Sequence, residues 1–85
     1  MKPFTFFSDN AHGWLRVSHS DCADIGFTGA SFSRYSYQDS AFYYLEEDCD
    51  ASKFLAAFVK KHGGMPVIHD SHTEGQSSIR RKARL

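Results

Sequence analysis

The chain has little of what specialised proteins use to hold metals, phosphates or membranes. Its 85 residues include only two cysteines, and neither a CxxC nor an HExxH motif occurs, which excludes the common zinc-binding motifs. It contains no glycine-rich phosphate loop and no apolar run long enough to span a bilayer. The formal net charge is zero, which argues against a dedicated nucleic-acid or membrane-surface protein.

The N-terminal stretch MKPFTFFSDN lacks the apolar centre of a signal peptide. We therefore expect a cytoplasmic protein with no membrane partner, in which Cys22 and Cys49 remain free and partly buried. Acidic residues flank Cys49 and should raise the pKa of its thiol, so a reactive nucleophile is not expected. We predict no cofactor, and a binding protein is favoured over an enzyme.

Aromatic residues, by contrast, are abundant. They make up 15% of the chain, with eight phenylalanines, four tyrosines and one tryptophan. Because each ring buries a large area, residues 1–85 can form a core as a single domain despite the short length. Charge is uneven: residues 1–52 carry three basic and eight acidic side chains, and residues 53–85 carry seven and two. Self-association would fit this asymmetry, but mixing of the charges on folding is the favoured interpretation.

The strongest local pattern predicts a helix over residues 49–62. Apolar residues recur on one face, and Asp48 is the expected N-cap. Gly63 is expected to end the helix in a left-handed conformation. The apolar stripe consists of Phe54, Leu55, Phe58 and Val59.

Alternating patterns predict strands on both sides of this helix. Two hairpins precede it and one strand, at residues 65–70, follows it; the basic tail 80–85 either returns within a last strand or frays. Residues 20–30 are expected to be an ordered connection with at most one helical turn. The fold predicted is α+β, an antiparallel sheet of five or six strands with one helix on one face, in the order ββ-ββ-α-β(β). The expected hairpins pair residues 4–7 with 12–18 and residues 32–37 with 41–46.

The tyrosines cluster on the second predicted hairpin and allow more than one interpretation. In the favoured interpretation half of the rings face the core, as we expect for Trp14. Alternatively the exposed rings form a protein-binding surface, with Trp14 and the acids Glu46 and Glu47 as its rim. A third interpretation combines the rings with Arg80 and Arg81 of the basic block to bind single-stranded nucleic acid. The tyrosines are Tyr35, Tyr37, Tyr43 and Tyr44.

One group of residues has the chemistry of metal ligands. His69, His72 and Glu74 lie close together in sequence and would suit zinc in a metal-dependent hydrolase. An isolated HxxH pattern is a weak signal, so the favoured interpretation is a solvent-exposed loop without metal.

Four short strings carry a resemblance that extends from residue 9 to residue 81. In their order and spacing they resemble a group of small uncharacterised proteins of bacterial phages, plasmids and other mobile elements. The resemblance implies a bacterial cytoplasm and an accessory role in which the protein binds a host protein; it implies no catalytic residue. The strings are His12–Leu15 (HGWL), Tyr35–Tyr37 (YSY), Tyr44–Asp50 (YLEEDCD) and Ser78–Arg80 (SIR).

Overall fold

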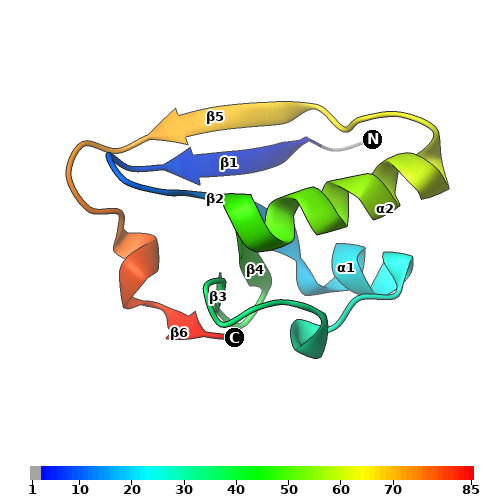
Figure 1. The fold of residues 1–85 in the computed structure, drawn as a ribbon, viewed down its shortest axis with the longest axis horizontal. Helices are drawn as coiled ribbons and strands as arrows, with labels where there is room; N and C mark the ends of the chain where they lie inside the picture. The colour runs from blue at the N-terminus through cyan, green and yellow to red at the C-terminus, as the bar shows by residue number, and fades with distance from the viewer. Residues whose placement is uncertain (1–2) are drawn as a thin grey trace.

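A computed structural model describes residues 3–85 and shows a six-stranded sheet with two α-helices (Figure 1). The predicted α+β fold is confirmed, with strand order β5-β1-β2-β4-β3-β6. The strands are β1 (Phe4–Ser8), β2 (Gly13–Ser18), β3 (Tyr37–Gln38), β4 (Phe42–Glu46), β5 (Ile68–His72) and β6 (Ala83–Arg84). The helical elements are α1 (His19–Ile25), the short η1 (Gly29–Ser31), η2 (Glu47–Ala51), α2 (Ser52–His62) and η3 (Ser78–Arg81).

The sheet is antiparallel except at one edge. Strand β2 pairs antiparallel with both β1 and β4, so that Leu15 lies opposite Phe6 on one side and Leu45 on the other. Strand β5 runs parallel to β1, which differs from the fully antiparallel sheet predicted. The reason is topological. Helix α2 carries the chain from the end of β4 back along the sheet, so β5 runs in the same direction as β4. Because β4 and β1 are both antiparallel to β2, β5 is also parallel to β1.

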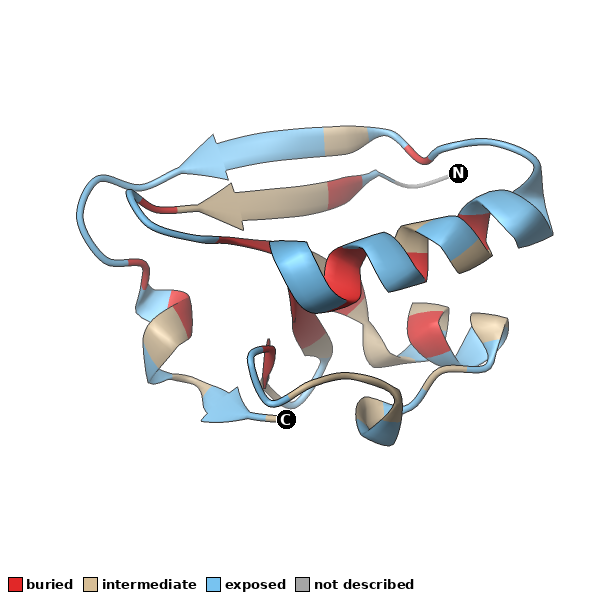
Figure 2. Ribbon diagram, in the orientation of Figure 1, coloured by how far each residue is buried: buried red, intermediate tan, exposed pale blue. Residues whose placement is uncertain are grey.

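One face of the sheet packs against the helices. Alternate residues of β1, β2 and β4 point to this face and form a core with α2, whose buried positions are interrupted by exposed ones (Figure 2). Phe54 and Phe58 meet Phe4 edge-on, with ring centroids 5.6 and 5.7 Å apart. Val59, predicted to join the apolar stripe, lies more at the surface.

The segment predicted as a connection contains a second helix, α1. Ser18 caps it by accepting a hydrogen bond from the backbone N–H of Asp21 at 3.0 Å. Gly26 ends it in the left-handed conformation, with φ of 93°. Its buried Cys22 contributes to the helix-side core. The prediction of at most one turn was wrong because the two caps stabilise a full seven-residue helix.

The predicted long helix is confirmed over residues 52–62, and Gly63 ends it as expected. The cap differs, however. Glu46 rather than Asp48 accepts the first free backbone N–H groups, those of Asp48 and Cys49, each at 3.0 Å. The chain between this cap and α2 forms one wide turn, η2, with the i to i+5 bonding of a π-helix.

Strand β3 is much shorter than the predicted strand at residues 32–37. Ser33 and Ser36 lie instead in a tight turn whose hydroxyl groups both donate to the buried carboxylate of Asp50. The backbone N–H of Ser33 donates to the same carboxylate at 3.0 Å. These bonds hold residues 33–36 against η2 and out of the sheet.

The other face of the sheet carries a smaller aromatic cluster. Trp14, Tyr37 and Tyr44 are buried there together with Ile79 of η3. Ile79 thereby fixes η3 against the sheet, and β6 then pairs antiparallel with β3. The C-terminal segment was expected either to return as a last strand or to fray, and the structure has the returning strand.

Among residues 3–85, no helix combines the length and the apolar character that a membrane span requires.

Candidate functional site

The sequence-predicted tyrosine surface is mostly internal. Tyr37, Tyr43 and Tyr44 are 6%, 9% and 5% exposed, and Trp14 is 2% exposed. Of the four candidate binding tyrosines, three are therefore buried: Tyr43 faces the helix-side core, and Tyr37 and Tyr44 face the smaller cluster. The expectation that Trp14 belongs to the core is confirmed. Tyr35, at 53% exposed, is the one ring of the predicted surface that is open to solvent.

The basic block contacts the aromatic cluster of its own chain. Alternate cations of residues 80–84 lie over its rings: Arg80 over Trp14 at 5.4 Å, Lys82 over Tyr44 at 5.0 Å and Arg84 over Tyr37 at 5.2 Å. The two features that the sequence offered for nucleic-acid binding thus pair with each other. Arg81, between them in sequence, is exposed.

A cleft of about 290 Å³ lies where this cluster reaches the surface. Trp14 and Tyr37 contribute buried aromatic surface to it, and Tyr35 stands exposed at its edge. The rings of Trp14 and Tyr37 meet edge-on at 6.1 Å between centroids, and the His12 ring lies 6.2 Å from that of Trp14. The cleft therefore has an aromatic floor built from two segments of the chain, residues 12–14 and residues 35–37.

Charged groups of both signs surround this floor. Arg80 and Arg84 line the cleft together with the acids Glu46 and Asp48. Of the predicted rim residues, Glu46 is buried, because it caps η2, whereas Glu47 is exposed. Charged groups of both signs around an apolar floor favour a ligand that has an apolar part and a charged part.

The buried carboxylate of Asp9 positions two of these lining residues. Its oxygens accept the backbone N–H groups of Ala11 and His12 at 2.9 Å, which fixes the turn between β1 and β2. They also accept the backbone N–H of Ser77 and two guanidinium N–H groups of Arg80, at 2.8 and 3.2 Å. The side-chain hydrogen bond from Arg80, outweighing desolvation, holds the pKa of Asp9 well below its usual range.

The buried carboxylate of Asp50 positions a further part of the cleft lining. By binding Ser33 and Ser36 it holds the turn that carries Tyr35. The Ser36 hydroxyl oxygen in turn accepts the backbone N–H of Glu46 at 2.9 Å. The exposed tyrosine and the acidic end of β4 are thus joined through one buried polar network.

Cys49 lines the cleft, but its thiol lacks the lowered pKa of a reactive cysteine. Both cysteines are free, as predicted, with Cys22 buried and Cys49 exposed rather than partly buried. Desolvation, then a hydrogen bond to Glu46 and the neighbouring acidic charges, raise the pKa of the Cys49 thiol. A cysteine of this kind stays protonated at neutral pH.

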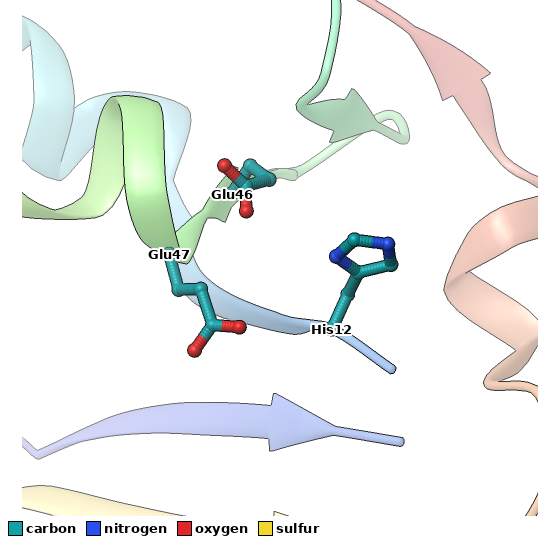
Figure 3. Close-up of side chains that lie close together, drawn as sticks. All are labelled: His12, Glu46 and Glu47. Atoms are coloured by element: carbon teal, nitrogen blue, oxygen red, sulfur yellow. The ribbon is translucent and has the colours of Figure 1, made fainter. Parts of the chain in front are cut away.

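His12, Glu46 and Glu47 form a group with potential metal ligands. One donor atom from each can be chosen so that all three lie within 4.8 Å of one another. Figure 3 shows the imidazole of His12 turned toward the space between the two glutamate side chains. His12 lies in the turn before β2, whereas Glu46 ends β4 and Glu47 begins η2. No spacing in the sequence brings these positions together, so sequence reasoning missed the group.

The metal candidate predicted from sequence does not form. His69 and His72 lie on β5, three residues apart, and side chains at that spacing in a strand point to opposite faces. His72 instead contacts Ser8 at 2.9 Å and Glu74 at 3.6 Å. In the described part of the chain, His12, Glu46 and Glu47 make up the one group with three potential ligands.

The acidic and basic halves of the chain mix in space, as the favoured interpretation expected. Arg80 pairs with Asp9 and Lys82 with Asp39, and in both cases a basic residue of the second half meets an acid of the first. Lys61 pairs with Asp24 in the same way at 3.2 Å.

No family model, no curated protein and no solved structure matches this chain.

Proposed function

We propose that the protein is a non-enzymatic interaction module that binds a short segment of a partner protein in the cleft beside Trp14. The observation that carries the proposal is the combination of a buried aromatic floor with charged walls of both signs. The volume of the cleft, about 290 Å³, lies just below the usual range for ligand pockets, about 300–1,000 Å³. Such a volume suits one or two side chains of a peptide better than a large cofactor.

The walls define the partner's chemistry. An apolar or aromatic side chain would fill the floor, while an acidic neighbour would meet Arg84 and a basic neighbour would meet Asp48. Tyr35 would close over the bound segment from the edge. Tyrosine and arginine are the residues that most often dominate such interfaces energetically.

The resemblance to small proteins of mobile elements adds the setting of the proposal. We propose that the protein acts in the cytoplasm of a bacterial host and that the partner is a host protein. An accessory protein carried by a phage or plasmid would act in this way by occupying a host surface. The chemistry of the cleft and the identity of the partner are separate proposals, and the first is tested without the second.

Single-stranded nucleic acid, the alternative predicted from sequence, receives less support. Base stacking needs exposed ring faces, and Arg80, Lys82 and Arg84 lie over those of the smaller cluster. Arg80 and Lys82 are also paired with Asp9 and Asp39. Binding of an oligothymidine at low salt that weakens steeply as salt is added would favour this alternative.

Selection from a random peptide library displayed on phage tests the proposal. We expect enrichment of peptides that carry an apolar or aromatic residue beside a charged one. Affinity for the enriched peptides should fall at least about tenfold in Tyr35→Ala, since a tyrosine that dominates an interface is worth about 2 kcal/mol or more, and tenfold corresponds to about 1.4 kcal/mol. Arg84→Ala should weaken the binding of those peptides in which an acidic residue neighbours the apolar or aromatic one.

Val67→Ala is the matched control. Val67 is 61% exposed, similar to Tyr35, and does not line the cleft. Its removal should leave the affinity unchanged. Failure to enrich any peptide, or equal affinities in Tyr35→Ala, Arg84→Ala and wild type, would refute the proposed function.

A further inference from the structure

A histidine and two consecutive glutamates, from two separate places in the sequence, converge at the acidic side of the cleft. We propose that His12, Glu46 and Glu47 bind a divalent transition-metal ion. His12 and Glu46 line the cleft, and Glu47 adjoins them from the first position of η2. The proposal goes beyond the binding of a protein segment, and it can be measured with the ion alone.

The donor atoms lie close to the separation that one shared ion requires. Imidazole nitrogen and carboxylate oxygen bind first-row ions at about 2.0–2.2 Å, so the ligands of a tetrahedral site lie about 3.3–3.6 Å from one another. The three donors lie within 4.8 Å of one another. Side-chain movements of about 1 Å bring them to that separation, and His12 and Glu47 are exposed and free to make them.

Glu46 is already oriented for the task. Its Oε1 accepts the backbone N–H groups of Asp48 and Cys49, both at 3.0 Å. Its Oε2 receives a longer contact from the same Asp48 N–H, at 3.2 Å, and the Cys49 thiol also donates to this carboxylate. Because a thiol is a weak donor, a cation can take its place while both 3.0 Å bonds to Oε1 remain.

The backbone beside the cluster also leaves room for the second carboxylate. A Cβ at Gly13 would lie 3.2 Å from Oε2 of Glu47. The missing side chain at Gly13 therefore lets Glu47 approach the start of β2, next to His12. His12 itself is held by the hydrogen bond from its backbone N–H to Asp9.

The local charge favours a cation. Four of the five residues from 46 to 50 are acidic. Within residues 3–85, the ion pairs involve other acids, and none joins a lysine or arginine to Glu46, Glu47 or Asp48. Arg84 is the unpaired cation that lines the same cleft and competes for these acids. A divalent ion would balance the charge of the two glutamates directly.

The donor set selects the class of ion. One imidazole with two carboxylates suits zinc, manganese, iron or cobalt, whereas magnesium prefers oxygen ligands alone. Three protein ligands leave at least one coordination position for a ligand from solution.

Cobalt(II) binding followed by tryptophan fluorescence tests the site. Trp14 is the only tryptophan, and its ring lies 6.2 Å from that of His12, so a paramagnetic ion on His12 should quench its emission. We expect saturable quenching with one equivalent bound in chelator-treated protein, and a single zinc-binding event in calorimetry. His12→Ala and Glu47→Ala should each weaken the affinity by at least about tenfold.

His72→Ala is the control, because His72 makes the other histidine–glutamate contact, with Glu74. It should bind cobalt like wild type, and magnesium should not quench. Both test positions are exposed, so circular dichroism should show unchanged folding. Absence of saturable quenching, quenching that survives in His12→Ala and Glu47→Ala, or quenching lost in His72→Ala would overturn the proposal.

Discussion

Replacing Asp9 should destabilise the protein more than replacing any exposed acid. The Asp9 side chain is fully buried and carries five hydrogen bonds, two of them from the guanidinium of Arg80. Removing one partner of a buried ion pair costs about 3–5 kcal/mol, because a charge and several donors are left without partners. A chain of this length has a free energy of unfolding of roughly 4–13 kcal/mol at typical values per residue. Asp9→Asn should therefore remove about a quarter of the stability or more.

The effect should depend on pH with a defined sign. Because the pKa of Asp9 is lowered on folding, the unfolded chain binds more protons between the folded and unfolded values. The carboxylate therefore stabilises the fold fully above about pH 5, and this contribution is lost as the pH falls through the unfolded value of about 3.9 toward the folded one. The difference in stability between wild type and Asp9→Asn should be largest near pH 7 and shrink by pH 3.

Urea unfolding at both pH values, followed through the buried Trp14, measures this difference. Asp24→Asn is the matched control, since Asp24 pairs with Lys61 at the surface, with side chains 65% and 44% exposed. Its cost should stay within about 1 kcal/mol. Equal effects of the two substitutions, or a cost for Asp9→Asn that grows as the pH falls, would refute the reasoning.

Three further predictions concern the core, one close contact and the thiols. Phe54→Ala should cost about 3–5 kcal/mol in urea unfolding, because Phe54 is fully buried between α2 and the sheet. Gly13→Ala should cost about 1–3 kcal/mol in the same assay, since the new Cβ would lie 2.3 Å from Cζ of Phe6; an unchanged midpoint would contradict the contact. Cys49 should react with a disulfide reagent more slowly at pH 7 than a free thiol does and faster as the pH rises, while Cys22, whose burial raises its pKa to about 12, should react only after unfolding.

Local patterns were sufficient for much of the fold. The spacing of Phe54 and Phe58, followed by Gly63, predicted α2 because helix periodicity and a left-handed stop are properties of neighbouring residues. Alternation around Leu15 likewise predicted β2 and its two faces. These elements form where local preference and tertiary packing agree.

The failures occurred where distant polar groups decide the conformation. Residues 33–36 alternate like a strand, but Asp50, seventeen positions away, draws the hydroxyl of Ser33 out of the sheet. Glu46 displaced Asp48 as the cap because the chain leaves β4 through a wide turn, and this turn places the N–H groups of residues 48 and 49 beside Glu46. No periodicity encodes such contacts, so the sequence did not predict the cleft or the convergence of His12 with Glu47.

Two buried aspartates explain how so small a chain can hold a shaped cleft. Asp9 ties the turn of His12 to Arg80, and Asp50 ties the turn of Tyr35 to the start of the helix, so each side of the cleft is set by a carboxylate that does not line it. A cleft held in this way needs little ordering when a ligand binds, which raises affinity without additional contacts. Under the proposed function, substitutions of Tyr35 and of the two aspartates should therefore have different effects. Tyr35→Ala should weaken binding and leave stability unchanged, whereas replacement of Asp9 or Asp50 should lower both affinity and stability.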